Sequence, residues 1–163
     1  MKKLLLILFA FATPFAVHSQ ASYGDLFLVD YNVKINVSTE NDSIFLSLIM
    51  TSASQKMTDD PKLLLRLMDD TVISLDGRLL GSTSRTDGAY MIGNVAVASN
   101  HFITEAKFPI TKEQMEQFAK GIKKLRLNTS PKFHEKSWRR DKIGRKLFDK
   151  YKESSGNSFE DDF

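Results

Sequence analysis

The stretch YNVKINV at residues 31–37 decides the fold class of this chain. Every second residue in it is apolar, and the residues between are polar; the apolar set is Tyr31, Val33, Ile35 and Val37. Strict alternation of this kind is typical of a strand with one face buried and the other in water. We therefore predict a half-buried strand in the second half of residues 25–37.

Turn and strand signals repeat along the next seventy residues. TEND at residues 39–42 has the composition of a turn, and SIFLSLIM at residues 43–50 predicts a partner strand. Residues 52–61 are polar and predict a loop. Five further short strands are predicted at residues 63–68, 71–75, 78–80, 89–98 and 101–108. The turns between them are predicted at Asp76-Gly77, at Thr86-Asp87-Gly88 and at Ser99-Asn100.

Helical signals are confined to the last third of the chain. Thr111 and Gln114 have the spacing of a capping box, and Gly121 is a stop signal, so a short helix is predicted at residues 112–120. Residues 122–128 return to strand alternation. A second helix is predicted at residues 137–152, where Ile143, Leu147 and Tyr151 form an apolar stripe.

These patterns together predict a mainly β chain of the α+β class. The expected architecture is an antiparallel β-sandwich or barrel-like domain with a short inserted helix and a C-terminal amphipathic helix. We expect a single domain over residues 20–153, because no repeat and no linker divides it. Residues 154–163 are rich in serine, glycine and acids, which predicts a disordered tail.

The first nineteen residues have the pattern of a secretory signal peptide. Lys2 and Lys3 precede an apolar run at residues 4–12, and small residues at Val17 and Ser19 predict cleavage before Gln20, or alternatively after Ala21. The expected location is the periplasm, the cell surface or the exterior of a Gram-negative bacterium. The chain has no cysteine, and no apolar run after the signal reaches the ~20 residues of a membrane span.

Charge is distributed unevenly along the chain. Residues 20–111 contain seven basic and eleven acidic residues, whereas residues 112–152 contain fourteen basic and five acidic ones, a net charge of +9. Arg139, Lys142, Lys146 and Lys150 fall within one arc of the predicted second helix, with Trp138 near its start. The simpler interpretation of this stripe is a solvated helix face that covers acidic parts of the domain.

The functional hypothesis is that the stripe docks an anionic partner. The partner could be an acidic protein, an anionic glycan or a lipid headgroup surface, and nucleic acid is not expected for an exported chain without stacking motifs. The protein is then a non-catalytic binding protein of the cell envelope. The alternative is a small hydrolase or a carbohydrate-binding module whose site is assembled from distant residues. A carbohydrate module would need Tyr23, Tyr31, Tyr90 or Trp138 as an exposed stacking platform.

No motif predicts catalysis, a metal or a cofactor. His134-Glu135 begins like the zinc-protease pattern HExxH, but residue 138 is Trp, so the second ligand is missing. His101 and Glu105 could share a strand face, although a metal would require a third ligand from elsewhere. We therefore expect no catalytic residue, no metal site and no cofactor.

Two segments resemble small exported proteins of Bacteroidetes. They are the KKLLL start with its cleavage site before Gln20, and the stretch AKFPITKEQ at residues 106–114 that continues through GIKKLRL at residues 121–127. The resemblance implies a strand, a short helix and a strand over residues 106–127, with Lys124 and Arg126 on an outer face. It implies no catalytic residues.

Overall fold

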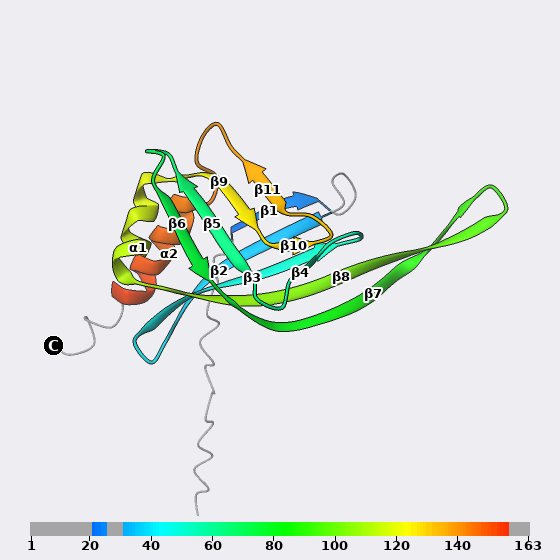
Figure 1. The fold of residues 1–163 in the computed structure, drawn as a ribbon, viewed down its shortest axis with the longest axis horizontal. Coiled ribbons are helices and arrows are strands. Elements are labelled where there is room, and N and C mark those ends of the chain that lie inside the picture. Colours follow the sequence, from blue (N-terminus) through cyan, green and yellow to red (C-terminus); the bar gives the residue numbers. More distant parts are fainter. Residues whose placement is uncertain (1–20, 26–30, 157–163) are drawn as a thin grey trace, which may run out of the picture.

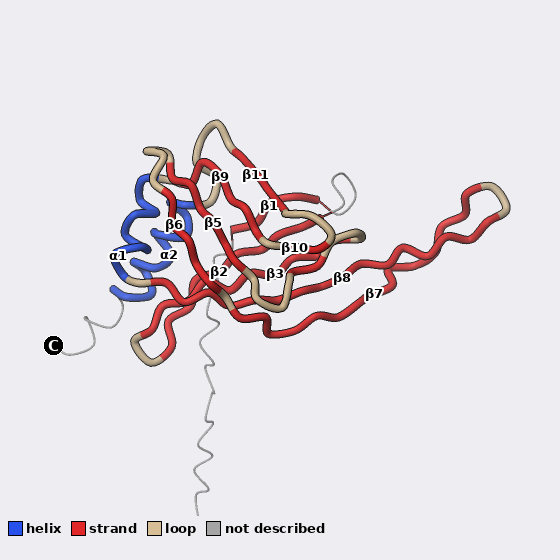
Figure 2. Tube along the Cα trace, in the orientation of Figure 1, coloured by secondary structure: helices blue, strands red, loops and turns tan. Residues whose placement is uncertain are grey.

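A computed structural model describes residues 21–25 and 31–156 of the chain. Two antiparallel sheets face each other, and the helices lie together at one end (Figure 1). A long hairpin extends from the opposite end (Figure 2). The predicted signal peptide and residues 157–163 of the predicted tail lie outside the described residues. Within the described part, no helix is long and apolar enough to cross a membrane.

The larger sheet has five strands in the order β1-β2-β3-β8-β7. Their bounds are β1 Ala21–Asp25, β2 Tyr31–Glu40, β3 Ser43–Ser52, β7 Arg78–Ile92 and β8 Val95–Ile110. The alternation predicted from residues 31–37 is confirmed, because Val33, Ile35 and Val37 are buried. The β2–β3 turn is also confirmed: Asn41 and Asp42 have φ of 47° and 61°, a left-handed conformation that asparagine and aspartate tolerate.

The smaller sheet has four strands in the order β11-β9-β5-β6. Their bounds are β5 Lys62–Leu67, β6 Val72–Asp76, β9 Ile122–Leu127 and β11 His134–Ser137. A separate pair joins β4 Lys56–Met57 to β10 Thr129–Ser130, so the segment predicted as a loop at residues 52–61 contains a short strand. Alternate leucines of β5 and β9 point inward, and the residues between them form the outer face of the sheet.

The first predicted helix is confirmed in both position and capping. α1 Lys112–Glu116 continues into the 3₁₀ turn η1 Gln117–Lys120, and the reciprocal hydrogen bonds of Thr111 and Gln114 form the capping box. Gly121 ends the helical segment with a φ of 84°, which a residue with a side chain rarely adopts. The second helix is α2 Gly144–Gly156.

One hydrophobic core lies between the two sheets and the helices. Side chains from β2, β3, β5, β8 and β9 meet there with Met115 of α1, Phe118 of η1 and Leu147 of α2. The expected mainly β architecture is therefore confirmed as an open sandwich, since the sheets do not close into a barrel.

The hairpin predicted at Asp76-Gly77 is wrong, because the chain changes sheets at this point. β6 belongs to the smaller sheet and β7 to the larger one. A Cβ at Gly77 would lie 2.4 Å from Cε1 of Phe108, so glycine is required here for a close approach rather than for a turn.

The turns predicted at Thr86-Asp87-Gly88 and at Ser99-Asn100 are also wrong. Both segments lie inside the long strands β7 and β8, and the first of them is a register shift between Thr86 and Ala89. The chain reverses instead at Gly93 and Asn94, between Ile92 and Val95, within the strand predicted at residues 89–98. Gly93 has a φ of 62°, the left-handed conformation typical of a two-residue hairpin turn.

The second helix begins later than predicted. Ser137 belongs to β11, and the backbone N–H of Trp138 still donates to the carbonyl of Lys123, so residues 137–143 are not helical. The carboxylate of Asp141 accepts hydrogen bonds from the backbone N–H groups of Ile143, Gly144 and Arg145, at 3.2, 2.8 and 2.8 Å. Asp141 therefore caps the start of α2, seven residues after the start predicted at residue 137.

Candidate functional site: a basic sheet face

Cross-strand pairing places cations side by side on the outer face of the smaller sheet. In one row, Arg66 of β5 lies opposite Lys124 of β9, and Lys124 lies opposite Ser137 of β11. In the next row, Leu64 pairs with Arg126, which pairs in turn with Glu135. Because inward and outward positions alternate along each strand, burying the leucines of β5 and β9 turns these cations toward solvent.

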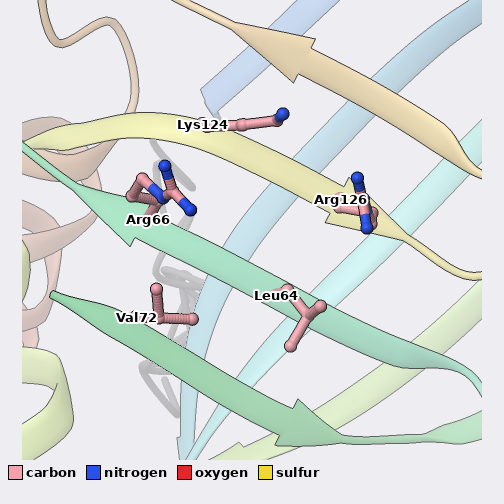
Figure 3. A pocket seen from close by; sticks show the side chains of 5 residues that line it. All are labelled: Leu64, Arg66, Val72, Lys124 and Arg126. Carbon is pink, nitrogen blue, oxygen red and sulfur yellow. The ribbon is translucent and has the colours of Figure 1, made fainter. Parts of the chain in front are cut away.

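Two shallow depressions adjoin on this face and share Arg66 and Lys124. The first encloses about 130 Å³ and is lined by Leu64, Arg66, Val72, Lys124 and Arg126, as Figure 3 shows. The second encloses about 310 Å³ and is lined by Arg66, Lys123, Lys124, Ser137, Trp138 and Arg139. We call the residues that line the two depressions the basic face. Its lining contains five cations and no carboxylate.

One carboxylate beside the basic face pairs with two of its cations. Glu135 Oε1 lies 2.6 Å from Lys124 Nζ, and Oε2 lies 2.7 Å from Arg126 Nη2. Hydrogen bonds from these two side chains hold the pKa of Glu135 below its usual value. Lys123 pairs with Asp70 at 2.9 Å. Five cations against these two carboxylates leave a net charge of +3 on and around the face.

Trp138 contributes an aromatic surface to the second depression. Its ring is half-buried and meets Tyr23 edge to face, with centroids 5.2 Å apart and planes at 83°. The backbone N–H of Trp138 donates to the carbonyl of Lys123 at 2.8 Å, which continues the β9–β11 pairing by one residue. The contact with Tyr23 therefore restricts the Trp138 ring, and the hydrogen bond to Lys123 of β9 fixes the Trp138 backbone.

Behind Trp138, aromatic side chains of both sheets pack together. Tyr23 Oη lies 3.0 Å from Nε2 of His134, and the two rings stack at 5.7 Å. Tyr31 meets the His134 ring at 4.5 Å. Burial lowers the pKa of His134 to about 4, helped by nearby Lys136, and burial raises the pKa of Tyr23 well above its usual value. Both groups are therefore neutral at pH 7, and His134 is an interior side chain.

The four-cation stripe predicted on the second helix is not present, because only two of its members lie on α2. Lys146 and Lys150 are on the helix, whereas Arg139 and Lys142 precede it. Trp138 and Arg139 belong to the basic face. The structure thus divides the predicted site among the outer sheet face, the segment before α2 that holds Lys142, and the helix. The carboxylate of Asp141 accepts the backbone N–H of Arg145.

The sequence analysis missed Arg66 as a site residue. It noted Lys124 and Arg126 only through the resemblance, which placed them on an outer face, and the structure confirms that placement. The signal that identifies all three is present in the sequence: cations occupy the polar positions of LLLRL at residues 63–67 and of KKLRL at residues 123–127. Finding the face still requires knowing that β5 and β9, far apart in sequence, are neighbours.

Among the described residues, no group of three His, Asp or Glu side chains could hold a metal ion. Comparison with known proteins returns no match: no family model, no curated protein and no solved structure matches the chain. Function therefore has to be argued from the geometry of the basic face.

Proposed function

We propose that the protein is an exported, non-catalytic binding protein of the cell envelope that docks an anionic glycan on the basic face. The observation that carries the proposal is the placement of Arg66 directly opposite Lys124, beside Arg126 and Arg139. Like charges opposite each other across two strands destabilise a sheet. Glu135 offsets part of this repulsion by pairing with Lys124 and Arg126, and an anion bound beside Arg66 and Arg139 would offset the remainder.

The chemistry of the second depression favours a glycan over other polyanions. Trp138 presents a fixed aromatic surface next to Arg66 and Arg139, and Ser137 adds a hydroxyl. An aromatic ring stacks on the apolar face of a sugar, while guanidinium groups pair with a carboxylate or sulfate in a bidentate manner. An uronic or sulfated sugar uses all three kinds of group.

The open shape of the site supports binding rather than hydrolysis. Both depressions are shallow, and their lining consists of cations, apolar groups and Ser137. A glycosidase needs two carboxyl groups on either side of the scissile bond. The alternative of a carbohydrate module that uses tyrosines as a stacking platform also loses support, because Tyr23 is buried and Tyr31 packs against the core. The side chain of Tyr90 lies outside the described ones.

The test is retention on an immobilised sulfated uronic polysaccharide such as heparin. We expect Arg66→Glu/Arg139→Glu to elute at a much lower salt concentration than the wild type, with at least a tenfold loss of affinity. Both side chains are exposed, so the fold, checked by circular dichroism, should persist.

The matched control is Lys142→Glu/Lys146→Glu, which makes the same change of charge on two exposed members of the original stripe. This control should keep most of the wild-type retention. An equal loss in both variants would mean that retention depends on the net charge of the protein and not on the basic face. A loss confined to the control would move the site to the helix and contradict the proposal.

A further inference from the structure

An exposed aromatic ring lies beside the basic face, at the opposite end of β11 from Trp138. Phe133 directly precedes β11 and Trp138 directly follows it. The Phe133 side chain is large and apolar, yet 61% of it is exposed. The guanidinium carbon of Arg126, which lines the first depression, lies 5.5 Å from the centroid of the Phe133 ring. The ring itself lines neither depression, so it lies just beyond the basic face.

The Phe133 ring is on the same side of the smaller sheet as the basic face. His134, the first residue of β11, is buried, whereas Glu135 pairs with Arg126 on the outer side. Because successive side chains of a strand point to opposite sides, Phe133 continues the outward set of Glu135 and Ser137. The contact between Phe133 and Arg126 agrees with this placement.

The backbone on both sides of Phe133 is held in place. Before it, the hydroxyl of Thr129 donates to the carbonyl of Lys132. After it, His134 pairs with Leu127 of β9. An aromatic side chain has few torsions to restrict, so covering this ring costs little conformational entropy once its backbone is fixed.

Aromatic rings and cations form one continuous track across the outer side of the sheet. From Phe133 the track runs through Arg126 to Lys124 in the first depression. From Lys124, which both depressions share, it continues to Arg139 and Trp138. A single exposed phenylalanine is ordinary in a soluble protein. This one completes a track that has an aromatic ring at each end.

The track is longer than two sugar rings. Phe133 and Trp138 are five residues apart along β11, so at ~3.3 Å per residue their Cα atoms lie roughly 16 Å apart. A disaccharide cannot cover both aromatic rings at once, whereas a longer oligosaccharide can.

The two ends of the track differ in charge. Within the described part of the chain, no carboxylate pairs with Arg66 or Arg139, which lie beside Trp138. At the other end, Glu135 pairs with Arg126 and offsets its charge. An acidic sugar is therefore attracted most strongly to the Trp138 end, and the far end offers mainly a stacking surface.

We propose that Phe133 is a second stacking subsite and that the basic face binds an oligosaccharide chain rather than a single acidic sugar. The chain anchors an uronic or sulfated residue at the Trp138 end, runs along β11 and stacks a further ring on Phe133. This inference rests on the proposed function, because it extends the same site. It adds selection for chain length, which the basic face alone does not require.

The test compares heparin-derived disaccharides and hexasaccharides by calorimetry, with the wild type and with Phe133→Ala. We expect Phe133→Ala to bind the hexasaccharide about three- to tenfold more weakly than the wild type and the disaccharide equally well. Longer chains also bind more tightly because they offer more registers, so the ratio between the two proteins at each length is decisive. The exposed position of Phe133 should leave the fold, checked by circular dichroism, unchanged.

Two further variants control for the loss of an exposed apolar side chain. Met91→Ala removes a side chain that is 65% exposed from the β7–β8 hairpin of the larger sheet, and it should bind both oligosaccharides like the wild type. Phe133→Tyr keeps an aromatic ring and should retain the wild-type affinity for the hexasaccharide.

A spectroscopic variant reports directly on the far end of the track. Trp138→Phe/Phe133→Trp moves the only tryptophan of the chain to position 133. The tryptophan emission of this variant should change when the hexasaccharide binds. It should change much less with the disaccharide at the same fractional occupancy, because the disaccharide stays at the anchoring end.

Failure of this inference can be distinguished from failure of the proposed function. Disaccharide binding together with an unchanged hexasaccharide affinity in Phe133→Ala would overturn the second subsite and leave glycan binding standing. An equal loss at both lengths would mean that Phe133 acts by holding Arg126, and it would also overturn the subsite. No binding of either oligosaccharide by the wild type would overturn both proposals.

Discussion

At the scale of single residues, two aspartates accept backbone hydrogen bonds that fix the ends of elements. Asp141 illustrates this best. Burial by itself raises its pKa, but hydrogen bonds from the backbone N–H groups of Arg145, Ile122, Gly144 and Ile143 hold the pKa below its usual value. Asp69 in the β5–β6 turn behaves similarly: hydrogen bonds from Lys120 and Thr71 lower its pKa to about 2.

His134 makes stability depend on pH in a defined window. Its pKa is about 4 in the folded chain, chiefly through burial, against 6.5 for an unperturbed histidine. Between these values the unfolded chain binds more protons than the folded one, so stability falls as the pH drops from 6.5 to 4. We expect the Tm to decrease over this range in wild type.

The variant His134→Gln isolates this effect, because an amide can still hydrogen-bond Tyr23 without titrating. Its Tm should decrease less than that of the wild type between pH 6.5 and pH 4. Thermal unfolding followed by circular dichroism measures both slopes. Identical slopes would show that His134 is not the group responsible.

At the scale of elements, the sequence predicted strand identity well and connections poorly. Periodicity reports which residues are buried, so β2, β3 and β9 were predicted nearly to their ends. The sequence does not show whether a glycine makes a turn or allows a close approach between segments. Gly77 allows a close approach to Phe108, whereas Gly93, placed inside a predicted strand, makes the turn. Only the partner strands distinguish these cases, and partners are set by long-range packing.

The start of α2 depends on one side chain, and this can be measured. Asp141→Ala removes the cap of α2 and leaves the N–H of Ile122, bonded at 2.9 Å in the structure, without its acceptor. Losing a cap costs about 0.5–2 kcal/mol and an unsatisfied amide about 1–3 kcal/mol, so we expect a loss of about 2–3 kcal/mol in the free energy of unfolding.

Asp141→Asn is the matched control, since its amide oxygen keeps an acceptor at the same place. In urea denaturation the free energy of unfolding should be highest for the wild type, lower for Asp141→Asn and lowest for Asp141→Ala. A Cβ added at Gly144 would lie 2.7 Å from the backbone nitrogen of Ile122. The start of α2 and residues 121–122 therefore form one closely packed junction. An alanine variant as stable as the wild type would contradict this role.

At the scale of the whole molecule, the basic face covers the outer side of the smaller sheet, opposite the side whose leucines pack in the core. The charge asymmetry in the sequence correctly indicated a cationic surface in the last third of the chain. Its location was wrong, because the docking of β5 against β9 brings Arg66 to the site from outside the basic segment.

The most direct test of the account uses Trp138, the only tryptophan of the chain, which lines the basic face. An uronic or sulfated oligosaccharide is titrated into the purified protein while the tryptophan emission is recorded. We predict a saturable change in emission that weakens with salt, is absent with a neutral oligosaccharide and is lost in Arg66→Glu/Arg139→Glu. Binding seen by calorimetry with unchanged emission, and retained in that variant, would place the ligand elsewhere and contradict the account.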